Sequence, residues 1–138
     1  MRLLIVLLFS LLLGGCGEEI SSHDKAYPYA FSLRVGEFNA EFAEAIAWWN
    51  AQPMAGAPML KVASNGPSLV LFASLAPGEI ARTWRFGGNF YVYFDPAYAW
   101  TLGTFCWAAR HELGHVLGLP HSSDPTDIMY PYLGGNSC

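Results

Sequence analysis

The chain has 138 residues, of which 53% are hydrophobic, 15% aromatic and only 13% charged, and its formal net charge is −4. This length allows one domain, and a composition this apolar offsets the conformational entropy of folding, which excludes disorder for most of the chain. Seven Lys and Arg residues against eleven Asp and Glu residues exclude the clustered basic surface that nucleic-acid binding requires. We therefore expect one folded, mildly acidic domain without a nucleic-acid partner.

Part of the apolar content belongs to the amino-terminal segment. Arg2 precedes residues 3–13, an apolar run that only Ser10 interrupts. The run is shorter than the roughly 20 residues of a membrane-spanning helix, and it has the layout of an export signal. Residues 1–15 are therefore interpreted as a signal peptide and excluded from the fold.

The residues around the end of this signal suggest a lipid anchor. The string Leu-Gly-Gly-Cys at residues 13–16 resembles a bacterial lipobox, in which the signal is cut before a cysteine that receives lipid. The sequence favours lipidation of Cys16 over ordinary secretion. Residues 16–26 then form a polar tether, residues 27–138 form the folded domain, and the protein is exported to the cell envelope, or secreted if Cys16 carries no lipid.

The folded region reads as a mixed layout of strands and two helices. Residues 29–35 alternate as a strand, and residues 40–52 carry apolar side chains at helical spacing, with Asn39 as the predicted cap and Pro53 as the stop. Four further strands are predicted at residues 60–63, 68–75, 80–86 and 90–94. A second helix begins near Thr101 or Thr104 and runs to Gly118, so the fold class is α+β.

Residues 111–121 carry the chemistry of this second helix. They fit the pattern H-E-x-x-H-x-x-G-x-x-H. His111 and His115 lie one helical turn apart on the same face, where both imidazoles can reach one metal ion. Gly118 can adopt the left-handed conformation that ends the helix and returns His121 as a third ligand. Three neutral nitrogens leave a fourth tetrahedral position for water, which predicts one catalytic Zn²⁺ with Glu112 beside it as general base.

With this motif and the methionine that follows it, the sequence resembles a metzincin metallopeptidase, and within that clan a matrixin. Met129, in the string Asp-Ile-Met-Tyr-Pro, corresponds to the clan's methionine turn. Ser122 after the third histidine and the string Met-Tyr-Pro are similar to matrixin usage. Weaker similarities lie at Trp49-Asn50, Gly87-Gly88, Phe94-Asp95 and Trp100-Thr101.

The resemblance implies a zincin-like fold, with a twisted and mostly parallel sheet, an active-site helix and a methionine turn. It implies a zinc-dependent endopeptidase that hydrolyses peptide bonds through a zinc-bound water, with Glu112 as the base. It further implies that the segment from Ile80 to Thr83 is an edge strand, in which Ile80, Ala81 and Arg82 contact an extended peptide or protein substrate. The sequence alone is equally consistent with a plain sheet edge there. Pro131, Tyr132 and Leu133 would form the wall of the pocket beside the zinc ion, which predicts an apolar side chain after the cleaved bond.

One feature departs from the family pattern, and a second lies outside the family's motif. Residues 24–110 contain no His, and Asp95 is followed by Pro-Ala, so the structural zinc and calcium of many matrixins are not expected. If Cys16 is lipidated, Cys106 and Cys138 remain as a pair, and export favours a disulfide between them over two free thiols.

A second hypothesis is a zinc-containing envelope lipoprotein that binds a partner without catalysis. Its zinc site would be closed by a fourth protein ligand, for which Asp124 or Asp127 is a candidate. Glu112 counts against this hypothesis, because a purely structural site has no use for an acid at that position. Under either hypothesis the protein is expected to be a monomer.

Overall fold

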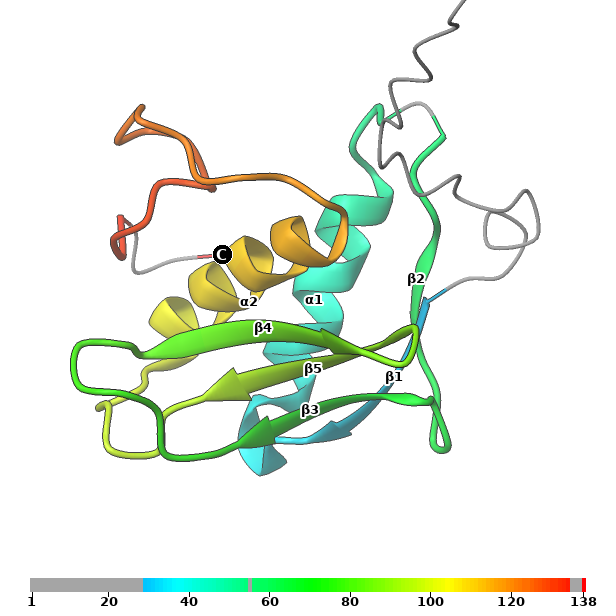
Figure 1. Ribbon diagram of the computed structural model, residues 1–138, viewed down its shortest axis with the longest axis horizontal. Helices are drawn as coiled ribbons and strands as arrows, with labels where there is room; N and C mark the ends of the chain where they lie inside the picture. Colours follow the sequence, from blue (N-terminus) through cyan, green and yellow to red (C-terminus); the bar gives the residue numbers. More distant parts are fainter. Residues whose placement is uncertain (1–28, 55, 135–137) are drawn as a thin grey trace, which may run out of the picture.

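A computed structural model describes residues 29–54, 56–134 and 138 (Figure 1). The strands are β1 (Tyr29–Arg34), β2 (Leu60–Val62), β3 (Ser68–Phe72), β4 (Ala81–Phe86) and β5 (Asn89–Phe94). The helices are α1 (Asn39–Asn50), α2 (Leu102–Val116) and the short 3-10 helix η1 (Gly36–Phe38). The predicted signal peptide, the lipidation site at Cys16 and the polar tether lie outside the described residues. Within them, no helix has the length and apolar character to cross a membrane.

The five strands form one sheet in the order β2-β1-β3-β5-β4. The β1–β2, β1–β3 and β3–β5 pairs are parallel, whereas β4 runs antiparallel to β5 through a tight turn at Gly87 and Gly88. The prediction of a mixed fold with a mostly parallel sheet is therefore confirmed. Among the strands that the structure describes, β4 is the last of the sheet, with β5 as its partner on one side and no strand on the other.

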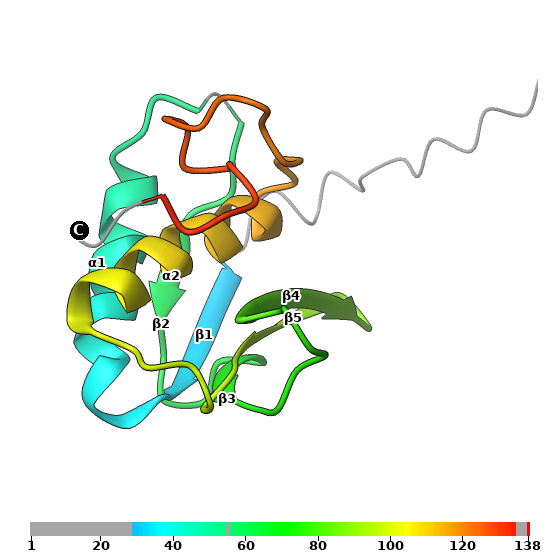
Figure 2. The same ribbon diagram turned by 90° about the vertical axis from the view of Figure 1, so that its left-hand side faces the viewer.

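Both long helices cover the same face of the sheet and pack against each other (Figures 1 and 2). The core between these layers is aromatic: Phe31, Phe42, Phe94 and Phe105 are fully buried. The ring centroids of Phe94 and Phe105 lie 4.2 Å apart, which joins β5 directly to α2. Each such side chain contributes about 1.5–3 kcal/mol of burial free energy, so this contact firmly anchors the amino-terminal half of α2.

The start of α1 differs from the prediction. Asn39 is the first residue of the helix and does not cap it; Phe38 occupies the cap position without a side-chain hydrogen bond. The Asn39 side chain instead accepts a hydrogen bond from the backbone N–H of Val35, 3.2 Å away. The prediction of Asn39 as the cap is wrong because η1 precedes α1 directly, and the Asn39 side chain stabilises that short turn.

Candidate active site

Local interactions set both ends of α2. Thr101 caps its amino-terminal end: its side chain accepts from the Thr104 N–H, and the Thr104 side chain accepts from the Thr101 N–H. At the other end, Gly118 has φ of 86°, and its N–H donates to His115 O while the Leu119 N–H donates to Gly114 O. These two bonds form a Schellman motif, for which glycine is suited because it has no Cβ. The Schellman motif turns the chain back directly after the end of α2, the helix that carries His111 and His115.

The three histidines of the sequence motif converge on one point. His115 Nε2 lies 3.2 Å from His111 Nε2 and 3.2 Å from His121 Nε2. The Nδ1 atoms of His111 and His115 contact the carbonyl oxygens of Ile128 at 2.8 Å and of Leu119 at 2.9 Å. A carbonyl oxygen only accepts, so each Nδ1 carries the hydrogen and each Nε2 presents a lone pair to the others.

This arrangement fits a tetrahedral zinc ion. Zinc–nitrogen bonds of about 2.0–2.1 Å in tetrahedral geometry separate two ligand nitrogens by about 3.3 Å, close to the observed 3.2 Å. Burial lowers the pKa of His111, although its hydrogen bond to Ile128 raises it, and the neutral form that burial favours is the one that binds metal. The lone pairs of His111 and His115 that point at each other would be unfavourable without a cation between them. Among the described residues, His111, His115 and His121 are the group of side chains that can hold a metal ion.

Glu112 lies beside this cluster on α2 and is only 5% exposed. Burial raises the pKa of Glu112 to about 7, while a hydrogen bond from the Thr83 side chain lowers it. The Thr83 hydroxyl lies 2.6 Å from Glu112 Oε2. A buried carboxyl group next to a metal site is suited to exchange protons with a reacting group.

The methionine turn packs beneath α2. Met129 is 4% exposed and lies against Gly114, where a Cβ would be 2.2 Å from the Met129 sulfur. Asp127 shapes the turn: its carboxylate accepts from the Met129 N–H at 2.8 Å, and its carbonyl accepts from the Tyr130 N–H. This turn presents the Ile128 carbonyl to His111, so the turn supports a metal-binding residue as well as the core.

The two acidic candidates for a fourth ligand have other partners. The Asp127 carboxylate bonds to the Met129 N–H. Asp124 Oδ1 accepts from both the backbone N–H and the hydroxyl of Thr126, and these hydrogen bonds lower the Asp124 pKa. Neither residue belongs to the described metal-binding group. Among the described residues, neither acidic side chain joins the three histidines as a fourth ligand.

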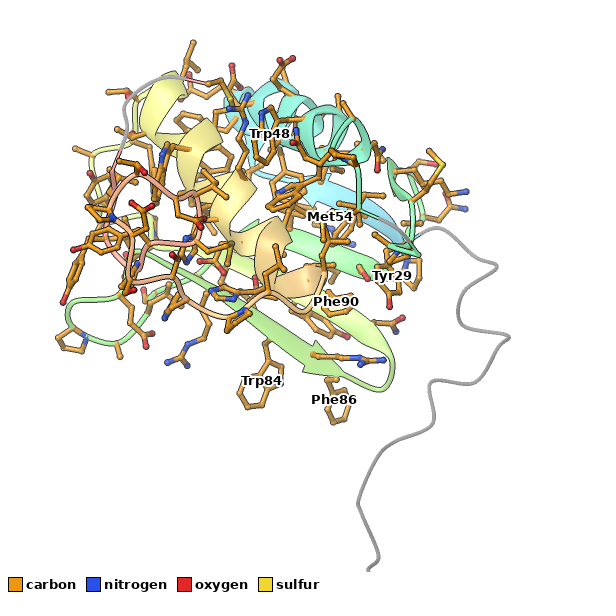
Figure 3. The ribbon with its side chains drawn as sticks, turned by 90° about the horizontal axis from the view of Figure 1, so that it is seen from above. Tyr29, Trp48, Met54, Trp84, Phe86 and Phe90 are labelled. Atoms are coloured by element: carbon orange, nitrogen blue, oxygen red, sulfur yellow. A yellow bond between two sulfur atoms is a disulfide. The ribbon has the colours of Figure 1, made fainter. Side chains whose placement is uncertain are left out.

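A groove of about 920 Å³ runs past the histidines. Ile80, Ala81 and Arg82 line it, and so do Pro131 and Tyr132. Tyr132 is 71% exposed, and the Arg82 side chain pairs with Glu79. At one end of the groove lie Tyr29, Met54 and Phe90 (Figure 3). The structure thus brings the residues predicted to contact substrate to the same groove as the histidines and Glu112.

Three contacts of the site were missed by the sequence analysis. The Trp49 indole donates to Arg110 O at 2.7 Å and fixes α1 against the helix turn before His111. The other two are the Thr83–Glu112 bond and the Gly114–Met129 packing. All three contacts join residues that are far apart in the sequence or belong to different parts of the fold. For the Thr83 contact, the nearest sequence signal is the alternation of β4, which places Thr83 on the same face of the strand as Ala81.

Cys106 and Cys138 form a disulfide, with their Cα atoms 5.6 Å apart. Cys106 lies in α2 and is 1% exposed. The bond ties the end of the chain to the helix that carries His111, Glu112 and His115.

Comparison with known proteins places the chain in a family. Residues 59–137, more than half of the chain, match the family model described as Matrixin, Peptidase_M10. Human matrilysin is 43% identical over 75 residues, which cover 51% of this chain and 26% of matrilysin. Human matrix metalloproteinase-20 is 44% identical over 71 residues, or 49% of this chain and 13% of the relative. Human neutrophil collagenase is 38% identical over 71 residues, or 49% and 14%. The matched part of the chain thus spans about a quarter or less of the length of these relatives. The family match, these relatives and the convergence of the three histidines agree, and the chain belongs to the matrixin family of metzincin metallopeptidases.

Proposed function

We propose that this protein is a zinc-dependent endopeptidase with one catalytic zinc ion. The observation that carries the proposal is the convergence of three imidazoles, with His115 Nε2 lying 3.2 Å from the Nε2 atoms of both His111 and His121. The buried carboxyl of Glu112 occupies the sequence position next to His111. His111, His115 and His121 would hold the ion. Three neutral nitrogen ligands and an open groove are the donor set and the access that a hydrolytic zinc site requires.

Glu112 is the general base in this proposal. Bound zinc supplies a Lewis acid that polarises the scissile carbonyl and lowers the pKa of water to about 7. Glu112 takes a proton from the attacking water and returns it to the leaving amine. The hydrogen bonds from His111 and His115 to backbone carbonyls keep both imidazoles in the tautomer that binds metal and prevent them from competing for that proton.

An extended peptide segment is the proposed substrate. The outer edge of β4 offers the backbone N–H and carbonyl groups of Ala81 and Thr83, to which a peptide adds as a further strand, with Ile80 and Arg82 flanking Ala81. The Ile80 carbonyl itself faces β5 and accepts from the Asp95 N–H. Pro131 and Tyr132 line the same groove and favour an apolar side chain after the cleaved bond. Backbone pairing of this kind recognises an extended chain of almost any sequence, so the side-chain pockets supply the selectivity.

The location of the protein is a separate proposal that depends on residues 1–26. We propose that residues 1–15 direct export and that lipid on Cys16 holds the enzyme at the cell envelope. Mass spectrometry of the mature amino terminus tests this directly. A chain that begins at Cys16 with the mass of attached acyl groups supports the proposal, and an unmodified terminus refutes the anchor.

Replacement of the base tests catalysis. Glu112→Ala should lower kcat by about 10²- to 10⁴-fold on a cleaved peptide, because Glu79, the other carboxyl among the described residues that line the groove, is paired with Arg82. Zinc content should stay near one per chain. Glu44→Ala, on the exposed face of α1, is the matched control and should retain activity.

Two outcomes contradict the proposal. The first is undiminished cleavage by the Glu112→Ala variant. The second is a wild-type protein that binds one zinc ion but cleaves no member of a diverse peptide library, which would support the non-catalytic binding module instead.

A further inference from the structure

The Glu112 carboxylate receives a hydrogen bond from the edge strand. Thr83 Oγ1 lies 2.6 Å from Glu112 Oε2 and 3.0 Å from the backbone oxygen of the same residue. In the part of the chain that the structure describes, no other side chain donates to this carboxylate. We propose that Thr83 is a positioning residue, which holds the carboxylate of Glu112 in one orientation at the groove. This inference rests on the proposed function, because it concerns how the base of that reaction is oriented.

The register of the β4–β5 pair puts Thr83 in this place. Thr83 pairs with Val92, which is fully buried against the helices, so both side chains point to the helix side of the sheet. Trp84 pairs with Tyr91 on the opposite face, where Trp84 and Phe86 project away from the body of the molecule (Figure 3). A shift of one residue would replace the Thr83 hydroxyl with a bulky side chain, so the register itself determines which group meets Glu112.

The Thr83 hydroxyl can orient Glu112 because both of its acceptors belong to that residue. A hydroxyl has one hydrogen, and the shorter contact, to the charged oxygen, is the stronger of the two. The weaker contact to the Glu112 backbone oxygen shares this one hydrogen, and because both acceptors belong to Glu112, the hydroxyl points at the residue that carries the base. A glutamate side chain has three rotatable bonds, and without this contact the carboxylate would sample several orientations, of which few suit proton transfer.

Substitution of the hydroxyl by a methyl group of similar size tests the proposal. Thr83→Val keeps the branched shape and the backbone of β4 but cannot donate. Loss of a hydrogen bond to a charged group predicts a kcat lower by about ten- to a hundredfold. KM should change by less than about twofold, because the substrate pairs with the strand backbone.

Two companion variants separate orientation from general damage to the strand. Thr83→Ser keeps the hydroxyl and should restore kcat to near the wild-type value. Tyr93→Phe removes a hydroxyl from the opposite face of the neighbouring strand and should leave both constants unchanged. All variants should bind one zinc ion per chain. A Thr83→Val variant with wild-type kcat, or a fall in kcat that Thr83→Ser shares, overturns the proposal.

Crystal structures of the zinc-loaded wild type and the Thr83→Val variant provide a readout that needs no activity. The wild type should show one Glu112 conformer within hydrogen-bond distance of Thr83, and the variant should show a displaced or divided carboxylate. An unchanged carboxylate in the variant overturns the positioning role. A wild type that holds Glu112 as described but cleaves no peptide refutes the proposed function alone, so the two failures are distinguishable.

Discussion

Gly114 offers a strong test of how the methionine turn supports the site. It lies in α2 between Glu112 and His115, and a Cβ at this position would lie 2.2 Å from the Met129 sulfur. The same Cβ would lie 3.1 Å from Trp49 Cζ2. We predict that Gly114→Ala destabilises the protein and weakens zinc binding, although alanine is the better helix former.

The sign of the stability change follows from two opposing terms. Alanine in place of glycine in a helix interior stabilises by about 1 kcal/mol. The new methyl group needs about 3.5–4.0 Å from its neighbours, so the sulfur must move by more than about 1 Å. Met129 and Trp49 are 4% and 6% exposed, which leaves neither a route into solvent. Overpacking of this kind costs about 1–3 kcal/mol, so the net loss is about 0–2 kcal/mol.

The effect of Gly114→Ala on zinc affinity follows because Met129 and Ile128 are neighbours in the chain. Met129 is joined to Ile128, whose carbonyl orients His111 at 2.8 Å. A displaced turn weakens that hydrogen bond, and loss of such a supporting contact typically lowers metal affinity by about 10- to 100-fold. Titration against a chelating zinc indicator measures this change.

Guanidinium unfolding with zinc in excess measures the stability change, and a double-mutant cycle identifies its cause. Met129→Ala alone should cost about 2–5 kcal/mol because it leaves a cavity. In the Gly114→Ala/Met129→Ala double variant, the added methyl no longer clashes, so the combined loss should be smaller than the sum by about 0.5–3 kcal/mol. Additive losses, or a Gly114→Ala variant that is more stable than the wild type, would refute this reasoning.

Two other predictions concern stability outside the metal site. Asp95 accepts from the N–H groups of Leu75 and Ala97, and these hydrogen bonds lower the pKa of its carboxyl. Its contribution is therefore present above the ordinary carboxyl pKa of about 4 and is lost as the pH falls through the lower folded value. Asp95→Asn should melt at a lower temperature than the wild type at pH 7, with the difference shrinking towards pH 3; a constant difference would contradict this. Replacement of both Cys106 and Cys138 by serine should cost about 3–4 kcal/mol, since the disulfide spans 32 residues. The wild type should lose similar stability on reduction while the double variant does not respond, and a wild type indifferent to reductant would count against the bond.

Hydrophobic periodicity predicted the elements most directly where one face of the element is buried. In β5, the buried residues Phe90, Val92 and Phe94 alternate with half-exposed ones, as a strand with one covered face requires. The predicted strands end within a few residues of the observed ones, and the choice between Thr101 and Thr104 as the cap of α2 is resolved in favour of Thr101. The Asn39 prediction was wrong because a preceding 3-10 turn leaves no trace in an apolar pattern.

The order of the strands was beyond the reach of these local patterns. The place of β4 at the edge, antiparallel to β5, depends on which hydrogen bonds form between strands, and periodicity carries no information about them. Its expected edge position came from the family resemblance. The contact from Thr83 to Glu112 joins residues 29 apart, and the bond from Trp49 to Arg110 joins residues 61 apart. Both depend on how the elements pack, which a motif of eleven residues cannot specify.

The two histidines of α2 differ in how their orientation is secured, and this difference marks where the site is most sensitive. His115 bonds to the carbonyl of Leu119, four residues away, which the glycine-dependent turn at the end of the helix presents to it. This hydrogen bond forms whenever residues 115–119 fold as the end of a helix. His111 bonds to Ile128, 17 residues away, and this support exists only when the methionine turn is docked. The metal site is thus partly a local property of α2 and partly a consequence of tertiary packing, so disturbance of the core beneath Gly114 should reach His111 before His115.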